Sequence, residues 1–342
     1  MAAGRSAKRS GWVRAGLRVT VAGAVGLGLL ATPAGAGAAP ELPPVSPEDL
    51  VSSVIAARHE PFAGTVELDN ALGLPPLPQL PQAADGTSTA RVWSGGEHQG
   101  RLSLPTAQGE RTIVTDGTTL WSWDSADRTV TRRPIGERQE ARAATDPTAA
   151  ATQAIEMLRS TSAVTVDGTA EVAGRPAYEL VLAPAPTERT LLREVRIAVD
   201  AEKRMPLRFS VLATGSAEPA LQVGFTDLTF GAQDPSLFTF TPPPGATVTA
   251  AEPKSTSPAP GAPATSGGPT VVGDGWDTVV IAKAPAEGRE SPDLSSLGTP
   301  VSGSWGSGRL ITTAVATAIV TDDGRIAAGA VPEQVLTEAL ST

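Results

Sequence analysis

The chain has 342 residues, of which 40% are hydrophobic and 18% charged, a balance typical of globular domains and a length sufficient for two of them. Its formal net charge is −9 and no basic patch stands out, which argues against a nucleic-acid partner. Cysteine is absent, which excludes disulfides, thiolate metal sites and a cysteine nucleophile.

The N-terminus has the three parts of a secretory signal peptide. Basic residues precede an apolar run at 19–31, and the small residues 34–38 follow with an A-x-A pattern. The run has 13 residues, fewer than the ~20 that a membrane helix needs. We therefore expect cleavage after Ala36 or Ala38, so that 1–38 is a signal peptide; the alternative is an uncleaved signal that anchors the protein. Removing residues 1–36, with five basic and no acidic side chains, takes the net charge from −9 to −14.

The segment after the signal predicts a short helix and then an antiparallel sheet. Ser46 is typical of an N-cap and Pro47 of a first helical position, and the apolar face ends near Arg58. Runs with strand character follow at 64–68, 87–93, 100–104, 112–115, 118–123 and 129–132, joined by short turns. The proline-rich stretch 72–81 lacks ladder donors, so we expect a loop at the rim of the sheet.

A second helix is predicted from Asp146 and Pro147 to about Arg159. Strands resume at 163–166, 170–172, 177–183, 192–199, 207–212 and 220–229, which indicates one long antiparallel sheet with two helices against it. The stretch 249–270 is rich in Pro, Ser and Gly and predicts a flexible linker. A small unit, 271–342, follows with strands at 277–282, 309–321 and 325–330 and a helix from Pro332.

Residues 116–124, DGTTLWSWD, hold two tryptophans one residue apart. Because side chains alternate across a strand, Trp121 and Trp123 share one face while Leu120, Ser122 and Asp124 take the other. The pair either packs on an ordinary core or lines a hollow for an apolar ligand. The residues by themselves leave both readings open.

No catalytic constellation is visible in the sequence. His59 and His98 each stand alone near the end of an element, and a transition-metal site needs several such donors. The stretch 303–308, GSWGSG, has the wrong spacing for a nucleophile elbow and is expected to be a loop. Asp116 and Asp124 occupy turn positions, where aspartate is expected for its backbone hydrogen bonds. We therefore expect no enzymatic activity, no cofactor and no metal.

Two segments resemble the LolA family of periplasmic lipoprotein carriers. Residues 110–133, ERTIVTDGTTLWSWDSADRTVTRR, are similar to the family's central hairpin, and residues 234–248, DPSLFTFTPPPGATV, to its closing strand with an F-x-F-x-P-P-x-G-x-x-V ending. The resemblance covers about residues 46–248. It implies an α+β fold, an unclosed antiparallel β-barrel (half-barrel) wrapped over short helices, followed here by a small C-terminal α+β unit.

The resemblance also implies an apolar cavity between the sheet and the helices that receives acyl chains. Its expected lining is aromatic: Trp93, Trp121, Trp123, Phe225, Phe238 and Phe240. The family's carriers have an arginine a few residues after the tryptophan that latches the lid, whereas residues 93–97 here read WSGGE. An opening and closing lid is therefore not implied for this chain.

The expected function is that of an exported, non-enzymatic, monomeric carrier or binder of a lipid or of lipoprotein acyl chains in the cell envelope. One alternative is an envelope-stress regulator that binds an anti-sigma factor or another membrane-anchored protein, because a related fold forms the N-terminal half of such regulators. A second domain after a linker fits that layout. Another alternative is a surface interaction module with a filled core.

Overall fold

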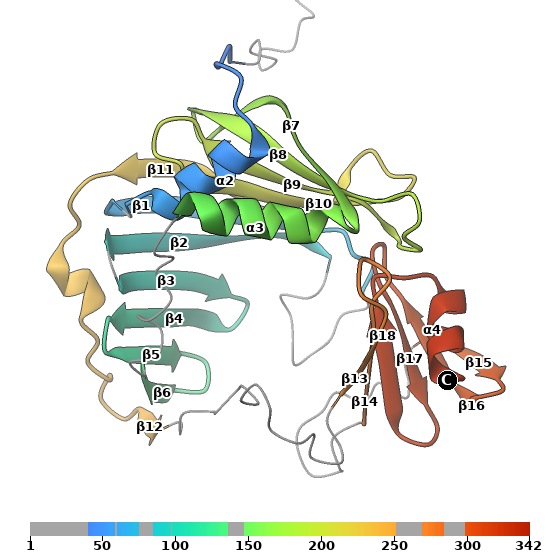
Figure 1. Cartoon of the computed structure of the whole chain (residues 1–342). Helices are drawn as coiled ribbons and strands as arrows, with labels where there is room; N and C mark the ends of the chain where they lie inside the picture. Colours follow the sequence, from blue (N-terminus) through green and yellow to red (C-terminus); the bar gives the residue numbers. More distant parts are fainter. Residues whose placement is uncertain are drawn as a thin grey trace, which may run out of the picture. The chain divides into compact units, whose positions relative to one another are not determined.

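A computed structural model describes residues 40–58, 60–74, 85–96, 98–135, 147–250, 269–283 and 298–342 (Figure 1). They belong to the compact unit Pro40–Thr342. The predicted signal peptide, His59, most of the proline-rich stretch and most of the predicted linker lie outside the described residues. The described strands form two separate sheets, one of 12 strands and one of 6.

The first sheet is antiparallel except at one edge, where its first two strands pair in parallel. Its strands lie in the order β12 (Thr247–Ala250), β6 (Thr129–Pro134), β5 (Thr119–Asp124), β4 (Gly109–Asp116), β3 (Gln99–Thr106), β2 (Gly86–Gly96), β1 (Phe62–Asn70), β11 (Pro219–Phe230), β10 (Pro206–Ala213), β9 (Leu192–Asp200), β8 (Arg175–Pro184) and β7 (Ser162–Val172). The order is linear, with β12 and β7 at its two ends, so the predicted unclosed sheet is confirmed.

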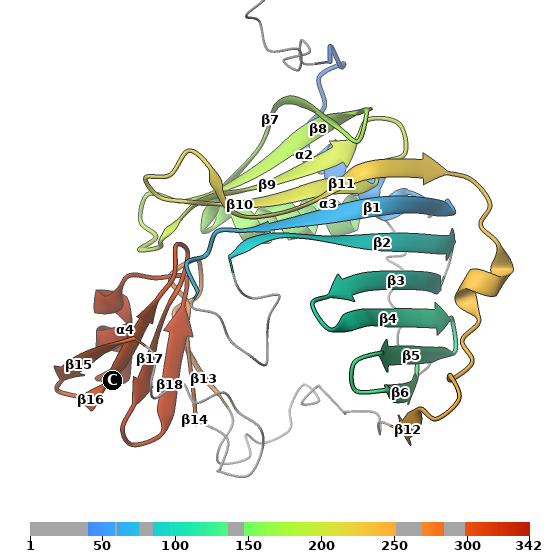
Figure 2. The ribbon, with the colours of Figure 1, turned by 180° about the vertical axis from the view of Figure 1, so that it is seen from behind.

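Two helices cover one face of the β7 end of this sheet. Helix α2 (Pro47–Ala56) begins as predicted, with the Ser46 side chain accepting a hydrogen bond from the Asp49 amide, and α3 (Pro147–Arg159) packs against it. Leu50 of α2 and Ile155 of α3 are buried, and they pack on a cluster from the sheet: Val164, Tyr178, Leu180 and Val199. The helices stand in front of the sheet in Figure 1 and behind it in Figure 2.

The strands differ from the predicted ones mainly at irregular positions. The two short strands expected at 163–166 and 170–172 form the single strand β7, whose pairing with β8 shifts between Val166 and Thr169. The closing segment, defined as residues 234–250, contains a short 3-10 helix, η3 (Pro235–Phe238), before β12. The irregular pairing between Val166 and Thr169 explains the apparent break in β7, because a β-bulge interrupts the alternation of apolar and polar residues without ending the strand.

The second sheet has the order β13 (Thr270–Val272), β14 (Val279–Lys283), β18 (Arg325–Gly329), β17 (Thr317–Thr321), β16 (Gly306–Thr312) and β15 (Thr299–Gly303), and it carries helix α4 (Glu333–Leu340). The predicted strand 309–321 is two strands, because Thr313 and Ala316 exchange hydrogen bonds that close a turn. The predicted loop 303–308 is wrong in part, because only residues 304 and 305 form the turn between β15 and β16, and residues 306–308 belong to β16. Trp305 of this turn is buried in the core of this unit with Ile319 and Leu336.

Candidate functional site

The pairing register sorts the side chains of the first sheet onto two faces. Paired residues on neighbouring strands point to the same side of a sheet. One row of successive pairs crosses the strands β2 to β6 through Trp93, Arg101, Val114, Trp121 and Arg132. Trp123 lies two residues further along β5 and therefore shares this side, as the alternation in the sequence predicts.

A second row identifies the side that the helices cover. It runs from β8 to β1 through Leu180, Ile197, Phe209, Val223 and Leu68. Leu180 and Ile197 pack with the buried residues of α2 and α3, so this row lies on the helix side. We call this side the helix-side face and the opposite side the outer face.

The tryptophan row lies on the outer face. The residue of β1 that pairs with Trp93 is Ala63, and the pairing of β1 with β2 is regular from Phe62 to Asn70. Ala63 is an odd number of residues from Leu68, and side chains alternate along a strand, so the two point to opposite sides. The register therefore places Trp93, Trp121 and Trp123 on the face away from α2 and α3.

The closing segment packs on these outer-face aromatics. The rings of Trp121 and Phe240 lie 5.6 Å apart between centroids, and the Arg132 guanidinium lies 5.4 Å from the Trp121 centroid. Phe238 is buried, and a Cβ built on Gly95 would come within 2.8 Å of its ring. Phe238 and Phe240 are thus brought to the sheet, but on its outer face.

Trp93 lies among cationic side chains on the same face. The guanidinium groups of Arg91 and Arg101 lie 4.9 and 6.0 Å from its ring centroid. Arg101 also donates from Nη1 to the carbonyl oxygen of Leu237 in η3, at 3.5 Å. Val114, the middle residue of the row, is fully buried. These contacts fix the closing segment across the outer face.

Of the predicted lining residues, Phe225 is the one that the register places on the helix-side face. It pairs with Val66, which lies two residues from Leu68 on β1. Its ring packs edge-on against Phe62, with 5.8 Å between centroids, and it lies across Gly64. The structure therefore divides the predicted set, with Phe225 on one side of the sheet and the tryptophans and the closing phenylalanines on the other.

The helix-side face is apolar well beyond the helices, and apart from Phe225 its residues were not among the predicted lining residues. A row from β1 to β4 contains Gly64, Val92, Leu102 and Ile113, and the last three are half-buried. Phe209 on β10 is 38% exposed. The sequence signal for this face was an apolar residue at every second position, as in Val66 and Leu68, Leu102 and Leu104, and Val223 and Phe225.

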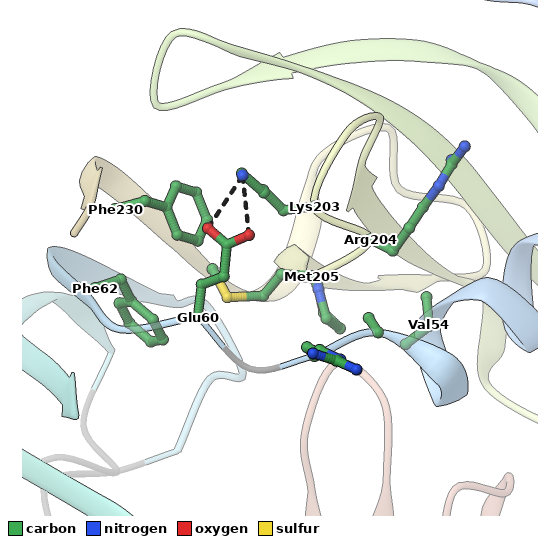
Figure 3. Close-up of a pocket in the computed structure, with 10 residues that line it drawn as sticks. Val54, Glu60, Phe62, Lys203, Arg204, Met205 and Phe230 are labelled. Carbon is green, nitrogen blue, oxygen red and sulfur yellow. Dashed lines mark hydrogen bonds and ion pairs between the residues drawn. The ribbon is translucent and has the colours of Figure 1, made fainter. Parts of the chain in front are cut away.

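A pocket of about 60 Å³ lies at the end of α2, next to the first residues of β1 (Figure 3). Its floor is apolar and includes Phe62, Met205 and Phe230, with Val54 of α2 on another side. The rings of Phe62 and Phe230 lie 6.2 Å apart between centroids. Because Phe62 also touches Phe225, three phenylalanine rings in sequence connect the helix-side face to this pocket.

An ion pair lies at the pocket (Figure 3). Lys203 Nζ lies 3.0 Å from the Glu60 carboxylate and 3.3 Å from that of Glu202. Hydrogen bonds to Glu60 and Glu202 raise the pKa of the Lys203 ammonium above its ordinary value, so it stays cationic at neutral pH. The same ammonium lies 5.7 Å from the centroid of Phe230, and the guanidinium of Arg175 lies 5.0 Å from it.

The turn between β9 and β10, which carries Lys203, is fixed by a buried carboxylate. Asp200 is fully buried and accepts hydrogen bonds from Arg175 and from the amides of Glu202 (2.8 Å) and Lys203 (2.6 Å). Burial raises the pKa of Asp200, but the hydrogen bonds from Arg175 and the two amides outweigh it, so the pKa lies below its ordinary value. The turn is therefore held with a charged aspartate at its base.

Arg204, the next residue of this turn, has φ +59°, in the left-handed region. Its guanidinium lies 5.2 Å from the Tyr178 ring centroid and, in Figure 3, points away from the Glu60–Lys203 pair. Its Nη1 is buried and has no hydrogen-bond partner among the described residues.

Neither a metal centre nor a membrane helix is found in the part of the chain that the structure describes. There, no three or more His, Cys, Asp or Glu side chains come together in a group that could hold a metal ion. His98 is exposed at the turn between β2 and β3. No helix within the described ranges has the length and apolar character needed to cross a bilayer.

No family model matches the sequence, and no curated protein matches it. Among solved structures, the chain is similar to one from the Pseudomonas aeruginosa MucA/MucB complex, at 17% identity and a TM-score of 0.47, over 85% of this chain and 94% of that one. It is also similar to an uncharacterised conserved protein from Thermus thermophilus, at 11% identity and a TM-score of 0.38, over 60% of this chain and 98% of that one. A LolA superfamily protein from Nitrosomonas europaea matches at 12% identity and a TM-score of 0.26, over 58% of this chain and 99% of that one. The sequence identity is low in all three matches.

Proposed function

We propose that the protein is an exported, non-enzymatic binder of apolar chains, such as the acyl chains of a lipid or a lipoprotein, in the cell envelope. The helix-side face is the proposed binding surface. Export rests on the signal-like residues 1–38 of the sequence.

The observation that carries this proposal is the incomplete burial of the helix-side rows. Leu102, Ile113 and Phe209 point to the same side as the helix-packed core, yet the described residues leave them half-buried or exposed. Their side chains contain no reactive group and no polar atom that a bound ligand would remove from water. Each methylene of a ligand buried there would contribute ~0.8 kcal/mol, so about ten would offset a large part of the ~4–15 kcal/mol that association costs.

A pair of neighbouring substitutions on β3 tests the proposal. Leu102 and Ser103 are both half-buried but point to the helix-side and outer faces. Leu102→Gln should weaken binding of a fluorescent long-chain fatty acid about tenfold, because an amide would be desolvated by the chain. Ser103→Gln is the matched control and should leave the affinity unchanged. Equal effects of the two substitutions, or no binding by the unsubstituted protein, would reject the helix-side site.

A second candidate function is binding of a membrane-anchored regulatory protein. Three large apolar side chains are exposed on the helices: Ile55 (42%) on α2, and Met157 (65%) and Leu158 (38%) on α3. Contiguous exposed apolar patches, and not single exposed side chains, are typical of protein interfaces, and α2 and α3, which carry these three, pack against each other. A photoreactive amino acid placed at Met157 and activated by light in the cells that produce the protein should cross-link it to a membrane protein. Cross-links to soluble proteins alone would argue against this role.

A further inference from the structure

More of the residues that line the pocket of Figure 3 are basic than acidic. Of its ten lining residues, Arg58, Lys203 and Arg204 are basic and Glu60 is acidic, but the Arg204 guanidinium lies against Tyr178 and points away from the Glu60–Lys203 pair. The chain as a whole has the opposite balance, with 36 acidic and 27 basic side chains. Because Lys203 is paired with Glu60 and Glu202, Arg58 is the remaining cation of the pocket. It has no carboxylate partner among the described residues, and such a cation attracts an anion.

Arg58 is the cation best placed to meet a ligand. It follows Ala57, the C-cap residue of α2, is exposed, and forms no ion pair with the other described residues. Lys203, by contrast, already lies between two carboxylates. The C-terminus of a helix carries about half a negative elementary charge. The full positive charge of Arg58 is larger, so the positive sign prevails at this end of α2.

The size of the pocket fits a headgroup and not a chain. Its volume of about 60 Å³ has room for a few water molecules, and hence for a carboxylate or a phosphate. The phenylalanine series Phe225, Phe62 and Phe230 continues from this pocket to the helix-side face, where apolar rows extend across the strands. A ligand with an anionic end and an apolar chain could therefore place one part in each.

We propose that the ligand of the helix-side face is an anionic amphiphile, whose carboxylate or phosphate is held in this pocket by Arg58 beside the Glu60–Lys203 pair. The proposal rests on the proposed function and adds the class of headgroup. A charge-assisted hydrogen bond from a guanidinium to an anionic oxygen is short and stronger than a neutral one, and Arg58 supplies such donors. Selectivity for the headgroup then depends on Arg58, which is not part of the apolar face.

The test compares three ligands with the same twelve-carbon chain, namely dodecanoate, dodecyl phosphate and dodecanol, by displacement of a fluorescent fatty acid from the full chain. At least one anion should bind about tenfold more tightly than the alcohol, and added salt should reduce this difference. Arg58→Gln should remove most of the preference while leaving dodecanol binding unchanged. Arg91→Gln, an exposed arginine on the outer face, is the matched control and should keep the preference.

The outcomes separate the two proposals. A tighter carboxylate or a tighter phosphate each supports an anionic headgroup and identifies which one. Equal affinities for all three ligands, or a preference that survives Arg58→Gln and Arg58→Glu, would overturn the headgroup proposal and leave the apolar site standing. Failure of all three ligands to bind would remove the proposed function and the headgroup proposal together.

Discussion

Gly64 is the position where the helix-side face leaves no room for a side chain. A Cβ built there would lie 2.7 Å from the Asp227 carbonyl oxygen and 2.9 Å from two ring carbons of Phe225. Real contacts of a Cβ are not this short, and the carbonyl belongs to the backbone, so β11 would have to shift along with the ring. Gly64→Ala is therefore an overpacking substitution in a fully paired strand.

The size of the effect follows from two opposing contributions. Overpacking costs ~1–3 kcal/mol, whereas replacing glycine by alanine in a strand regains roughly 0.5–1 kcal/mol. We expect Gly64→Ala to lower the free energy of unfolding by ~1–2 kcal/mol and to weaken binding of a fatty acid, because the Phe225 ring is displaced.

Gly100 on β3 supplies the matched control. A Cβ built on it would meet its nearest atom, the Thr115 methyl, at 3.6 Å, which is an ordinary contact. Gly100→Ala should therefore be neutral or stabilising by roughly 0.5–1 kcal/mol. Urea denaturation of both variants gives the two values. A Gly64→Ala protein as stable as Gly100→Ala would show that Phe225 does not lie across Gly64.

Three further predictions concern other parts of the chain. Trp121→Ala should speed protease cleavage within 234–250 without changing fatty-acid affinity, because Trp121 packs on Phe240; lost affinity would contradict its outer-face role. The pKa of Asp200 is depressed, so the stabilisation of the fold by its charge is present above pH ~4 and lost as the pH falls further. Asp200→Asn should lower the free energy of unfolding by about 3 kcal/mol at pH 7, the low end for a broken buried pair, because Arg175 is 23% exposed. An acid melting profile unchanged by the substitution would refute this. N-terminal sequencing of exported protein should begin at Gly37 or Ala39; an intact Met1 would indicate an anchored form.

The sequence was sufficient for the strand order of the central hairpin and for the shared face of Trp121 and Trp123, because alternation along a strand needs no tertiary information. It could not tell which face the helices cover. The residues by themselves left an ordinary core and a cavity open, and the cavity side was implied only by the resemblance to the LolA family. The aromatic residues of the closing segment, Phe238 and Phe240, instead pack on the face of the tryptophans, and this depends on contacts across more than a hundred residues.

Other differences have local causes that a periodicity reading does not resolve. Trp305 lies in a hairpin turn, where a large aromatic is unexpected, but Gly303 leaves space for its indole, so the turn points into the core. The turn between β16 and β17 contains no Asn or Asp, and Thr313 closes it instead through its hydroxyl. The pocket beside α2 escaped notice because its parts come from segments near 58, 204 and 230.

The most direct test of the helix-side site is photolabelling of the purified protein with a fatty acid that carries a diazirine near the end of its chain, followed by peptide mapping. We predict labels on helix-side residues such as Leu102, Ile113 and Phe209, and competition by unlabelled fatty acid. Labels confined to the outer-face residues Trp121 and Trp123, or to the second sheet, would contradict the account.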